Sequence, residues 1–193
     1  MVAWHGQPNR RQQTRYASSV EQARAVIIGG GVGGTSIAYH LTLAGWTDIV
    51  LVERAELTSG STFHSAGLVG QLRGSVTLTR MMQYSAGLYR RLREDTGVDP
   101  NGHEVGSIRL ASSKARMEEL DRQLGWAQTF GLPMDSITAR EAQERFPLMS
   151  TDGVVGGVWL PTDGWLDPTG LATAFAAGAR SRGASIRTGT CVV

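Results

Sequence analysis

The sequence predicts an α/β fold built around a parallel strand–helix–strand unit, and three stretches carry this prediction. Residues 25–28 form a short apolar run of Ala, Val and Ile, which has the length and branched composition of a buried parallel strand. Residues 35–44 then place Ile37, Ala38, Leu41 and Ala44 at helical spacing, and Gly45 follows as a helix stop. Residues 49–52 repeat the apolar strand pattern. We therefore expect a Rossmann-like unit near the start of the chain.

The turn between the first strand and the helix carries a glycine motif. Gly29, Gly31 and Gly34 have the spacing G-x-G-x-x-G. In such a turn the first glycine permits the bend, the second lets backbone N–H groups approach a pyrophosphate, and the third lets the helix pack closely on the strand. Glu53 ends the second strand, where its carboxylate would accept hydrogen bonds from ribose hydroxyls. Together these features predict a dinucleotide-binding site.

Composition narrows the class of protein. The chain has 193 residues, 41% of them hydrophobic and 19% charged, with a net charge of +2, which is ordinary for a globular protein. Neither the charge distribution nor any apolar run indicates nucleic-acid binding or a membrane-spanning segment. Cys191 is the only cysteine, so we expect no internal disulfide and no metal site. A reducing compartment fits this usage, either the cytoplasm or, in a eukaryote, the mitochondrial matrix.

Residues 1–23 differ from the rest of the chain. They are polar and rich in Gln, Arg and Asn, and no acidic residue precedes Glu21. This composition fits either a disordered extension or a mitochondrial presequence. Both alternatives stay open.

The stretch from Leu57 to Gly70 replaces the crossover helix expected after a second strand. It consists largely of small side chains with one aromatic residue and His64, a composition typical of close backbone contacts. Further along, capping residues and periodicity predict the remaining elements. These are helices from Ser75 to Gly97, over 114–130, from Thr138 to Pro147 and from Asp167 to Arg182, and strands from Val105, over 153–160 and over 184–193.

At VIIGGGVGG, LVERAELTSGSTFHSAGL, GSIRLAS, RFPLM and DGWLDP, the sequence resembles the FAD-dependent amine oxidoreductases of the D-amino-acid oxidase superfamily. Within it, the likeness is to the group of sarcosine dehydrogenase, dimethylglycine dehydrogenase and dimethylglycine oxidase, and it covers residues 24–193. The resemblance implies an FAD-binding first part over 24–100, the start of an α+β substrate domain over 101–165, and an incomplete return to the FAD-binding domain over 166–193. A sheet begun by parallel strands needs more strands after Val193, so we interpret the sequence as a truncated chain.

The resemblance also implies roles for individual residues. His64 matches the histidine that is bonded covalently to the flavin 8α-methyl carbon, and imidazole is a suitable nucleophile for that bond. Separately from the resemblance, Arg73 follows His64 by nine residues and is a candidate for facing either a substrate carboxylate or the developing negative charge of the flavin. No other catalytic residue can be assigned. The positions implied to bind FAD are Gly29, Gly31, Val32, Gly33, Gly34, Glu53, Arg54, Ser61, Thr62, His64, Leu68 and Val192.

The implied reaction is oxidation of an N-methyl amine, such as sarcosine or dimethylglycine, by hydride transfer to flavin N5. The iminium product would give formaldehyde, or methylene-tetrahydrofolate if the full-length protein has a folate-binding domain. An electron-transferring flavoprotein is a possible partner. Two alternatives stay open: a non-covalent FAD amine or amino-acid oxidase, and a non-catalytic relative such as the pyruvate dehydrogenase phosphatase regulatory subunit. The fragment alone is expected to be inactive.

Overall fold

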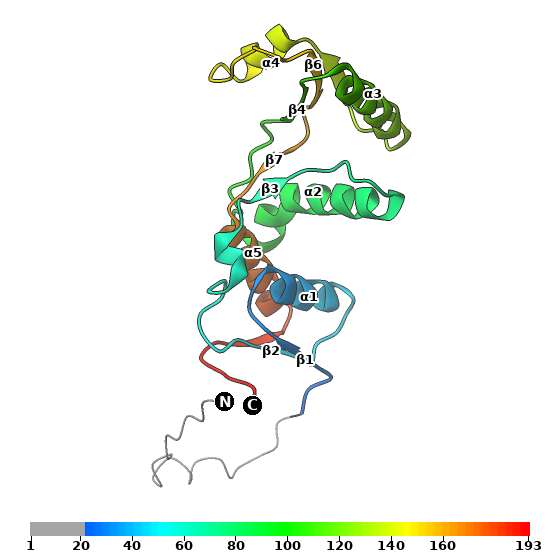
Figure 1. Ribbon diagram of the computed structural model, residues 1–193. Helices are drawn as coiled ribbons and strands as arrows, with labels where there is room; N and C mark the ends of the chain where they lie inside the picture. Colours follow the sequence, from blue (N-terminus) through cyan, green and yellow to red (C-terminus); the bar gives the residue numbers. More distant parts are fainter. Residues whose placement is uncertain (1–21) are drawn as a thin grey trace, which may run out of the picture.

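The computed structural model describes residues 22–193 of the chain. Figure 1 shows an elongated molecule, with a parallel sheet at one end, an antiparallel sheet at the other, and helices stacked between them. The extension predicted for residues 1–23 lies outside the described residues, apart from its last two positions. Among the described residues, no helix combines the length and the hydropathy needed to cross a membrane.

The parallel sheet contains the predicted strand–helix–strand unit. Helix α1 (Val32–Leu43) connects the first two strands, and Val50 of the second strand pairs with Ser185 from the far end of the sequence. All the pairings run parallel, which confirms the predicted α/β class. The strands, in spatial order, are β1 (Ala25–Ile28), β2 (Ile49–Val52) and β8 (Ser185–Arg187).

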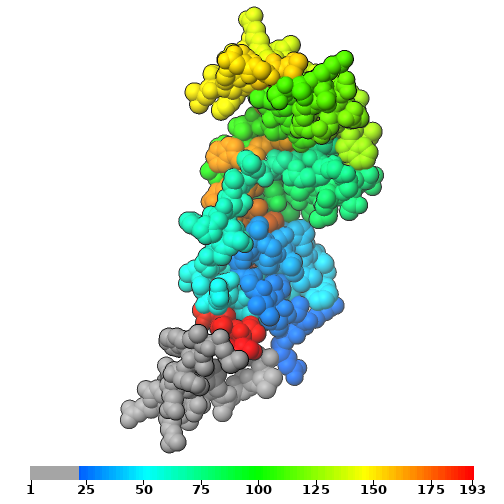
Figure 2. Space-filling model, in the orientation of Figure 1, coloured from blue at the N-terminus to red at the C-terminus, as the bar shows by residue number. Residues whose placement is uncertain are grey.

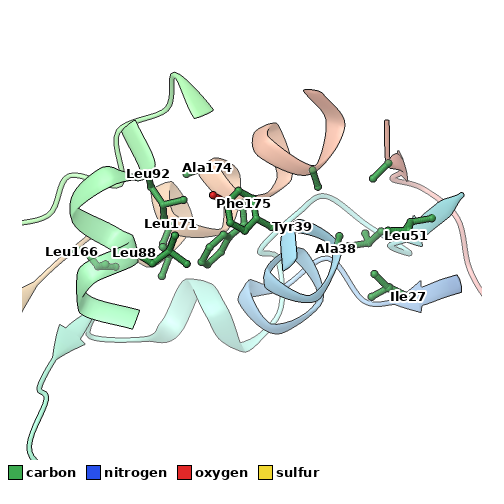
Figure 3. Packing of buried hydrophobic residues seen from close by; sticks show 13 residues of the cluster. Ile27, Ala38, Tyr39, Leu51, Leu88, Leu92, Leu166, Leu171, Ala174 and Phe175 are labelled. Carbon is green, nitrogen blue, oxygen red and sulfur yellow. The ribbon is translucent and has the colours of Figure 1, made fainter. Parts of the chain in front are cut away.

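Two helices from distant parts of the sequence form the core on this sheet. Helices α1 and α5 (Pro168–Ser181) lie side by side (Figure 1), and α2 (Val76–Thr96) packs against α5. Tyr39 of α1 is fully buried, and its ring centroid lies 5.3 Å from that of Phe175 on α5. Figure 3 shows these two rings between the leucines of α2 and the sheet residues. The predicted unit is therefore held together by its contact with α5.

The buried face of α1 differs from the prediction. Ile37 is 52% exposed and Ala44 is also exposed, so the predicted apolar face is wrong at these two positions. The hydroxyl of Thr35 donates to the carbonyl of Gly31 at 3.0 Å, and that of Thr42 donates to the carbonyl of Tyr39 at 2.7 Å. Because each threonine is paired within the helix, it can be buried without an unsatisfied polar atom. The buried residues of α1 are Thr35, Ala38, Tyr39 and Thr42.

Side-chain caps begin the other helices where the sequence predicts them. Ser75 accepts a hydrogen bond from the N–H of Leu78, and Asp167 accepts hydrogen bonds from the N–H groups of Thr169 and Gly170. Thr138 and Glu141 form the predicted capping box. The structure thus confirms α2 and α5, together with α3 (Lys114–Thr129) and α4 (Ala139–Arg145).

The antiparallel sheet is covered by α3 and has the strand order β4 (Ser107–Ala111), β6 (Gly156–Leu160) and β5 (Asp135–Ile137). Its core includes Leu120 of α3, with Val158 and Leu160 of the central strand, all almost completely buried. The strand predicted over 153–160 begins only at Gly156, and three strands of two or three residues were not predicted because they are too short to show periodicity. The strands outside the parallel sheet are β3 (Leu68–Val69), β4 (Ser107–Ala111), β5 (Asp135–Ile137), β6 (Gly156–Leu160) and β7 (Gly164–Trp165), with β3 and β7 paired.

The last predicted strand is wrong beyond Arg187. The chain leaves the sheet there and turns at Gly189, which has a φ of 65°. Residues other than glycine rarely adopt this backbone conformation. The N–H of Thr190 then donates to the carbonyl of Glu53 at 2.8 Å. Val192 therefore lies outside any strand and is 53% exposed.

Candidate dinucleotide-binding site

The glycine turn between β1 and α1 is tightly built. Gly29 has a φ of 108°, and a Cβ at Gly34 would overlap the carbonyl oxygen of Gly29. Both positions therefore need glycine for the turn and for the close approach of helix and strand. Gly33 is different, since a Cβ there would meet no protein atom within 4 Å. The protein's own packing does not require glycine at 33, so the open space beside it is available to a ligand.

The N-terminus of α1 is suited to an anion. Its cap residue Gly31 offers no side-chain hydrogen bond, and the first turn contains no acidic residue. The first N–H groups of a helix have no partner within it and carry partial positive charge. One of them, the N–H of Val32, donates to Oγ1 of Thr62 at 2.9 Å. The helix end thus combines positive potential with open approach, as a pyrophosphate site requires.

Glu53 supports the turn with its carboxylate. Oε2 accepts a hydrogen bond from the N–H of Gly30 at 2.7 Å, and Oε1 accepts one from the N–H of Ala55 at 2.9 Å. These bonds, the one from Gly30 first, hold the pKa of Glu53 below its usual value. Each oxygen keeps a further lone pair for a ribose hydroxyl. Binding of the ribose by Glu53 stays a prediction.

Gly30 is part of the site, although the motif spacing does not mark it. It is buried, and a Cβ there would lie 2.6 Å from Cδ2 of Leu57. Its carbonyl accepts a hydrogen bond from the N–H of Thr58, which is buried with a φ of 68°. The run of three glycines was the only signal for this position in the sequence. The close contacts confirm that the segment of small residues packs tightly by its backbone.

His64 lies on a short 3-10 helix, η2 (Ser61–His64), beside the end of α1. Thr62 of η2 is buried and accepts the hydrogen bond from Val32, whereas Phe63 and His64 are exposed. At Gly67 a Cβ would overlap the carbonyl oxygen of Leu166. The segment thus contacts the start of α1 through Thr62, and through Gly67 it contacts Leu166, which lies two residues before α5. In Figure 2 the cyan atoms of this segment lie at the surface beside the blue atoms of β1 and α1.

The remaining positions predicted to bind FAD are at the surface. Arg54, Ser61 and Leu68 are exposed, and Leu68 retains 79% of its accessible surface. The segment that contains Val192 lies against the end of β2, because the N–H of Gly189 donates to the carbonyl of Ala55 at 3.2 Å. The structure therefore brings the predicted residues of the turn, of the end of β2 and of η2 to one edge of the parallel sheet.

Arg73 does not join this arrangement. Its N–H donates to Oγ1 of Thr79 at 3.1 Å, and its guanidinium donates to the carbonyl of Leu72 at 3.2 Å. The indole Nε1 of Trp126 donates to the carbonyl of Arg73 at 3.3 Å. These contacts place Arg73 beside α2 and α3 rather than beside η2. Its proposed contact with a substrate carboxylate stays a prediction.

Comparison with known proteins decides the family. The model of the family described as FAD dependent oxidoreductase matches residues 24–193. The chain belongs to this family. As a member of the FAD-dependent oxidoreductases it is expected to bind FAD. The residues present fit that dinucleotide, because the helix end has no acidic residue, the backbone at Gly33 is open to approach, and Glu53 lies at the end of β2 with a lowered pKa.

Three similar proteins show how much of each longer relative this chain matches. The chain is 42% identical over 170 residues to human mitochondrial dimethylglycine dehydrogenase, which covers 86% of this chain and 19% of the relative. It is 37% identical over 172 residues to the mouse mitochondrial pyruvate dehydrogenase phosphatase regulatory subunit, covering 89% and 20% respectively. The crystal structure of L-proline dehydrogenase from P. horikoshii superimposes with a TM-score of 0.81 at 31% identity, covering 87% of this chain and 44% of that one. The chain thus spans about a fifth of the length of these curated relatives.

Proposed function

We propose that the protein containing this chain oxidises an N-methyl amine, with sarcosine and dimethylglycine as first candidates. The observation that carries the proposal is the exposed His64 on a short helix that Thr62 attaches to the end of α1. When bound, FAD would supply the electron acceptor for a hydride from the N-methyl carbon. The identity of 42% to human dimethylglycine dehydrogenase supports this substrate class.

The chain's own residues would bind and orient the cofactor. The glycine turn and the first N–H groups of α1 hold the pyrophosphate, and Glu53 holds the ribose hydroxyls. Arg54 and Val192 stand at the same end of β2, on the adenosine side, while Ser61, Thr62 and Leu68 serve the flavin side. We propose that residues 101–165 begin the substrate domain, whose further parts bind the amine.

His64 would tie the flavin to the protein covalently. Imidazole attacks carbon when one ring nitrogen is unprotonated, and His64 is exposed rather than enclosed by protein. Its neighbours fix the backbone at that point, because Thr62 is buried and Gly67 packs against Leu166. A rigid attachment would hold the reactive ring in one place against the substrate carbon.

The test uses the full-length protein purified with its flavin. We expect acid denaturation and removal of small molecules to leave yellow absorbance and an FAD-sized mass increment on the peptide that contains His64. His64→Ala should lose both, whereas His103→Gln, which alters a histidine stacked on Trp165, should retain both. Release of free FAD by the wild type would contradict covalent attachment and favour a non-covalent amine oxidase.

A non-catalytic role is the second candidate, supported by the 37% identity to the mouse phosphatase regulatory subunit. In that case the fold would serve as an interaction domain. Purification of the full-length protein without flavin, and without oxidation of sarcosine or dimethylglycine, would favour this role.

For the enzyme, we expect electrons to pass to oxygen or to an electron-transferring flavoprotein, and a folate-binding domain to be required for any transfer of the methyl carbon. We propose the cytoplasm, or the mitochondrial matrix in a eukaryote, as its location.

A further inference from the structure

A cavity lies away from the glycine turn, between residues 72–74, β4 and α3. Its volume is about 550 Å³. Three arginines line it, Arg73, Arg109 and Arg122, each from a different segment of the chain. The indole ring of Trp126 forms part of the same wall. Three arginines from three segments and one aromatic residue therefore line a single space.

The positive charges in this cavity are not neutralised by carboxylates within 4 Å. Arg109 donates to Oε1 of Gln123 at 2.7 Å and to the carbonyl of Leu72 at 3.4 Å, both neutral acceptors. None of the ion pairs among residues 22–193 includes Arg73, Arg109 or Arg122; they are Arg90–Glu104, Arg91–Asp95, Arg93–Asp99, Arg116–Glu119 and Arg140–Glu144. The acidic residue in the cavity wall, Glu119, is thus already paired with Arg116.

Arg109 lies among charges of both signs. Burial lowers the pKa of Arg109, the nearby Asp163 carboxylate raises it, and the nearby charges of Arg73 and Arg116 lower it. Asp163 is buried and accepts hydrogen bonds from the N–H of Gln71 and the hydroxyl of Ser107, both neutral donors, so it keeps its negative charge. The three arginines of the cavity still outnumber this one carboxylate. Like charges gathered in a partly enclosed cavity raise the local potential and attract anions.

Trp126 adds a second kind of surface. Its Nε1 donates to the carbonyl of Arg73 at 3.3 Å, and its ring meets Phe130 edge to face at 5.3 Å between centroids. The indole is thus fixed in orientation and still 37% exposed. A flat apolar group bound between this ring and the arginines would be removed from water. Because the Trp126 side chain is already held in place, it would lose little conformational entropy on binding that group.

From this geometry we propose that the cavity binds a small organic anion with two or more negative charges, carried by phosphate or carboxylate groups. Arg73, Arg109 and Arg122 would bind the charged groups, since guanidinium donors match phosphate and carboxylate oxygens. Trp126 would contact the apolar part. The site is separate from the FAD-binding turn, and its existence does not depend on the proposed amine oxidation.

The experiment measures binding of phenyl phosphate to the flavin-loaded, full-length protein by calorimetry. Bound flavin keeps the probe out of the pyrophosphate site. We expect saturable binding that is tighter than that of inorganic phosphate, and Arg122→Gln should raise the dissociation constant by about tenfold, the usual consequence of losing one charge-assisted pair. Arg122 is exposed, so the variant should fold, which an unchanged melting temperature without probe would establish. Arg140→Gln on α4 is the matched control and should change the dissociation constant less than about twofold.

Several results would overturn the proposal. Absence of saturable phenyl phosphate binding would do so, as would equal affinity in the wild type and Arg122→Gln. Equal affinity for inorganic phosphate and phenyl phosphate would remove the role of Trp126. Displacement of the probe by dimethylglycine would show that the cavity holds the amine substrate's carboxylate, and not a separate anion.

Discussion

The backbone N–H of Val32 donates a hydrogen bond of 2.9 Å to Oγ1 of Thr62, and this bond joins the two halves of the candidate site. Val32 begins α1, whose N-terminus is the proposed pyrophosphate position, and Thr62 lies two residues before His64. The Thr62 side chain thus helps to hold the segment of His64 beside the turn, together with the hydrogen bond from Thr58 to the carbonyl of Gly30. The positions are far apart in the sequence, and periodicity alone did not relate them.

This bond makes Thr62 the first residue to change. Thr62→Val keeps the shape of the side chain but leaves the N–H of Val32 without its acceptor, at a cost of about 1–3 kcal/mol in the free energy of unfolding. Thr62→Ser keeps the hydroxyl and should lose clearly less. Chemical unfolding of the purified full-length variants would compare them, together with the fraction of protein that retains flavin. Equal losses in both variants would show that the methyl packing of Thr62 matters, and not its hydrogen bond.

Gly33 and Gly34 are neighbours with opposite predicted effects. Gly33→Ala places its Cβ in open space within a helix, so the flavin-free protein should keep or gain stability, by about 0.5–1 kcal/mol. Its affinity for FAD should nevertheless fall, because the methyl group occupies the open cradle. Gly34→Ala forces a Cβ onto the carbonyl of Gly29 and should prevent correct folding. Undiminished FAD binding by a folded Gly33→Ala protein would argue against pyrophosphate at this turn.

The carboxylate of Glu53 predicts a specific pH dependence. Its hydrogen bonds, the one from Gly30 foremost, lower its pKa in the folded state below the value of about 4.3 for a free glutamate. A lowered folded-state pKa gives stability that is present above the unfolded pKa and is lost as the pH falls through the folded one. The wild type should therefore be more stable than Glu53→Gln at pH 7, and this advantage should start to shrink as the pH falls below the unfolded value of about 4.3 and be lost once the pH passes below the lowered folded-state pKa.

Unfolding by urea at a series of pH values would measure this difference. Glu118→Gln, on the exposed surface of α3, serves as the matched control and should not alter the wild-type profile. A constant difference between wild type and Glu53→Gln at every pH would mean that the side chain acts through packing rather than through its charge.

The contact between α1 and α5 depends on a missing side chain. A Cβ at Gly178 would lie 2.6 Å from Cε2 of Tyr39, so Gly178→Ala should destabilise the fold by about 1–3 kcal/mol through overpacking. In contrast, a Cβ added at Gly125 of α3 would have no protein atom within 4 Å. Gly125→Ala should therefore stabilise by about 0.5–1 kcal/mol, as expected for glycine in a helix. Thermal melts of both variants check this contrast, and destabilisation by both would contradict it.

Local signals predicted much of the fold. The caps at Ser75, Thr138 and Asp167 marked their helices because capping depends on residues within one turn of each other. The strand-helix-strand unit followed from its glycine spacing and apolar runs for the same reason. The exposed Ile37 could not be foreseen, because its surroundings are set by how α5 packs on α1, a contact between distant segments.

The candidate site was predicted less completely than the fold. The turn glycines and Glu53 were identified from the sequence, and the structure places them together. The bond from Gly30 to Glu53 was missed because it depends on how β1 and β2 align in the sheet. Arg73 was grouped with the site because it follows His64 closely in sequence, whereas the fold turns the chain toward α3 in between. Sequence neighbours beyond a few residues are poor guides to shared sites.

The pairing of β2 with β8 has a consequence for how this protein is made. Val50 cannot meet Ser185 until almost all of the described chain has left the ribosome. Until then α1 lacks α5, and the apolar surface around Tyr39 has nothing to cover it. Long-range pairings of this kind form slowly, and until they form the intermediates expose apolar surface that can aggregate. The nascent chain is therefore expected to need chaperones during synthesis, although its completed fold buries this surface.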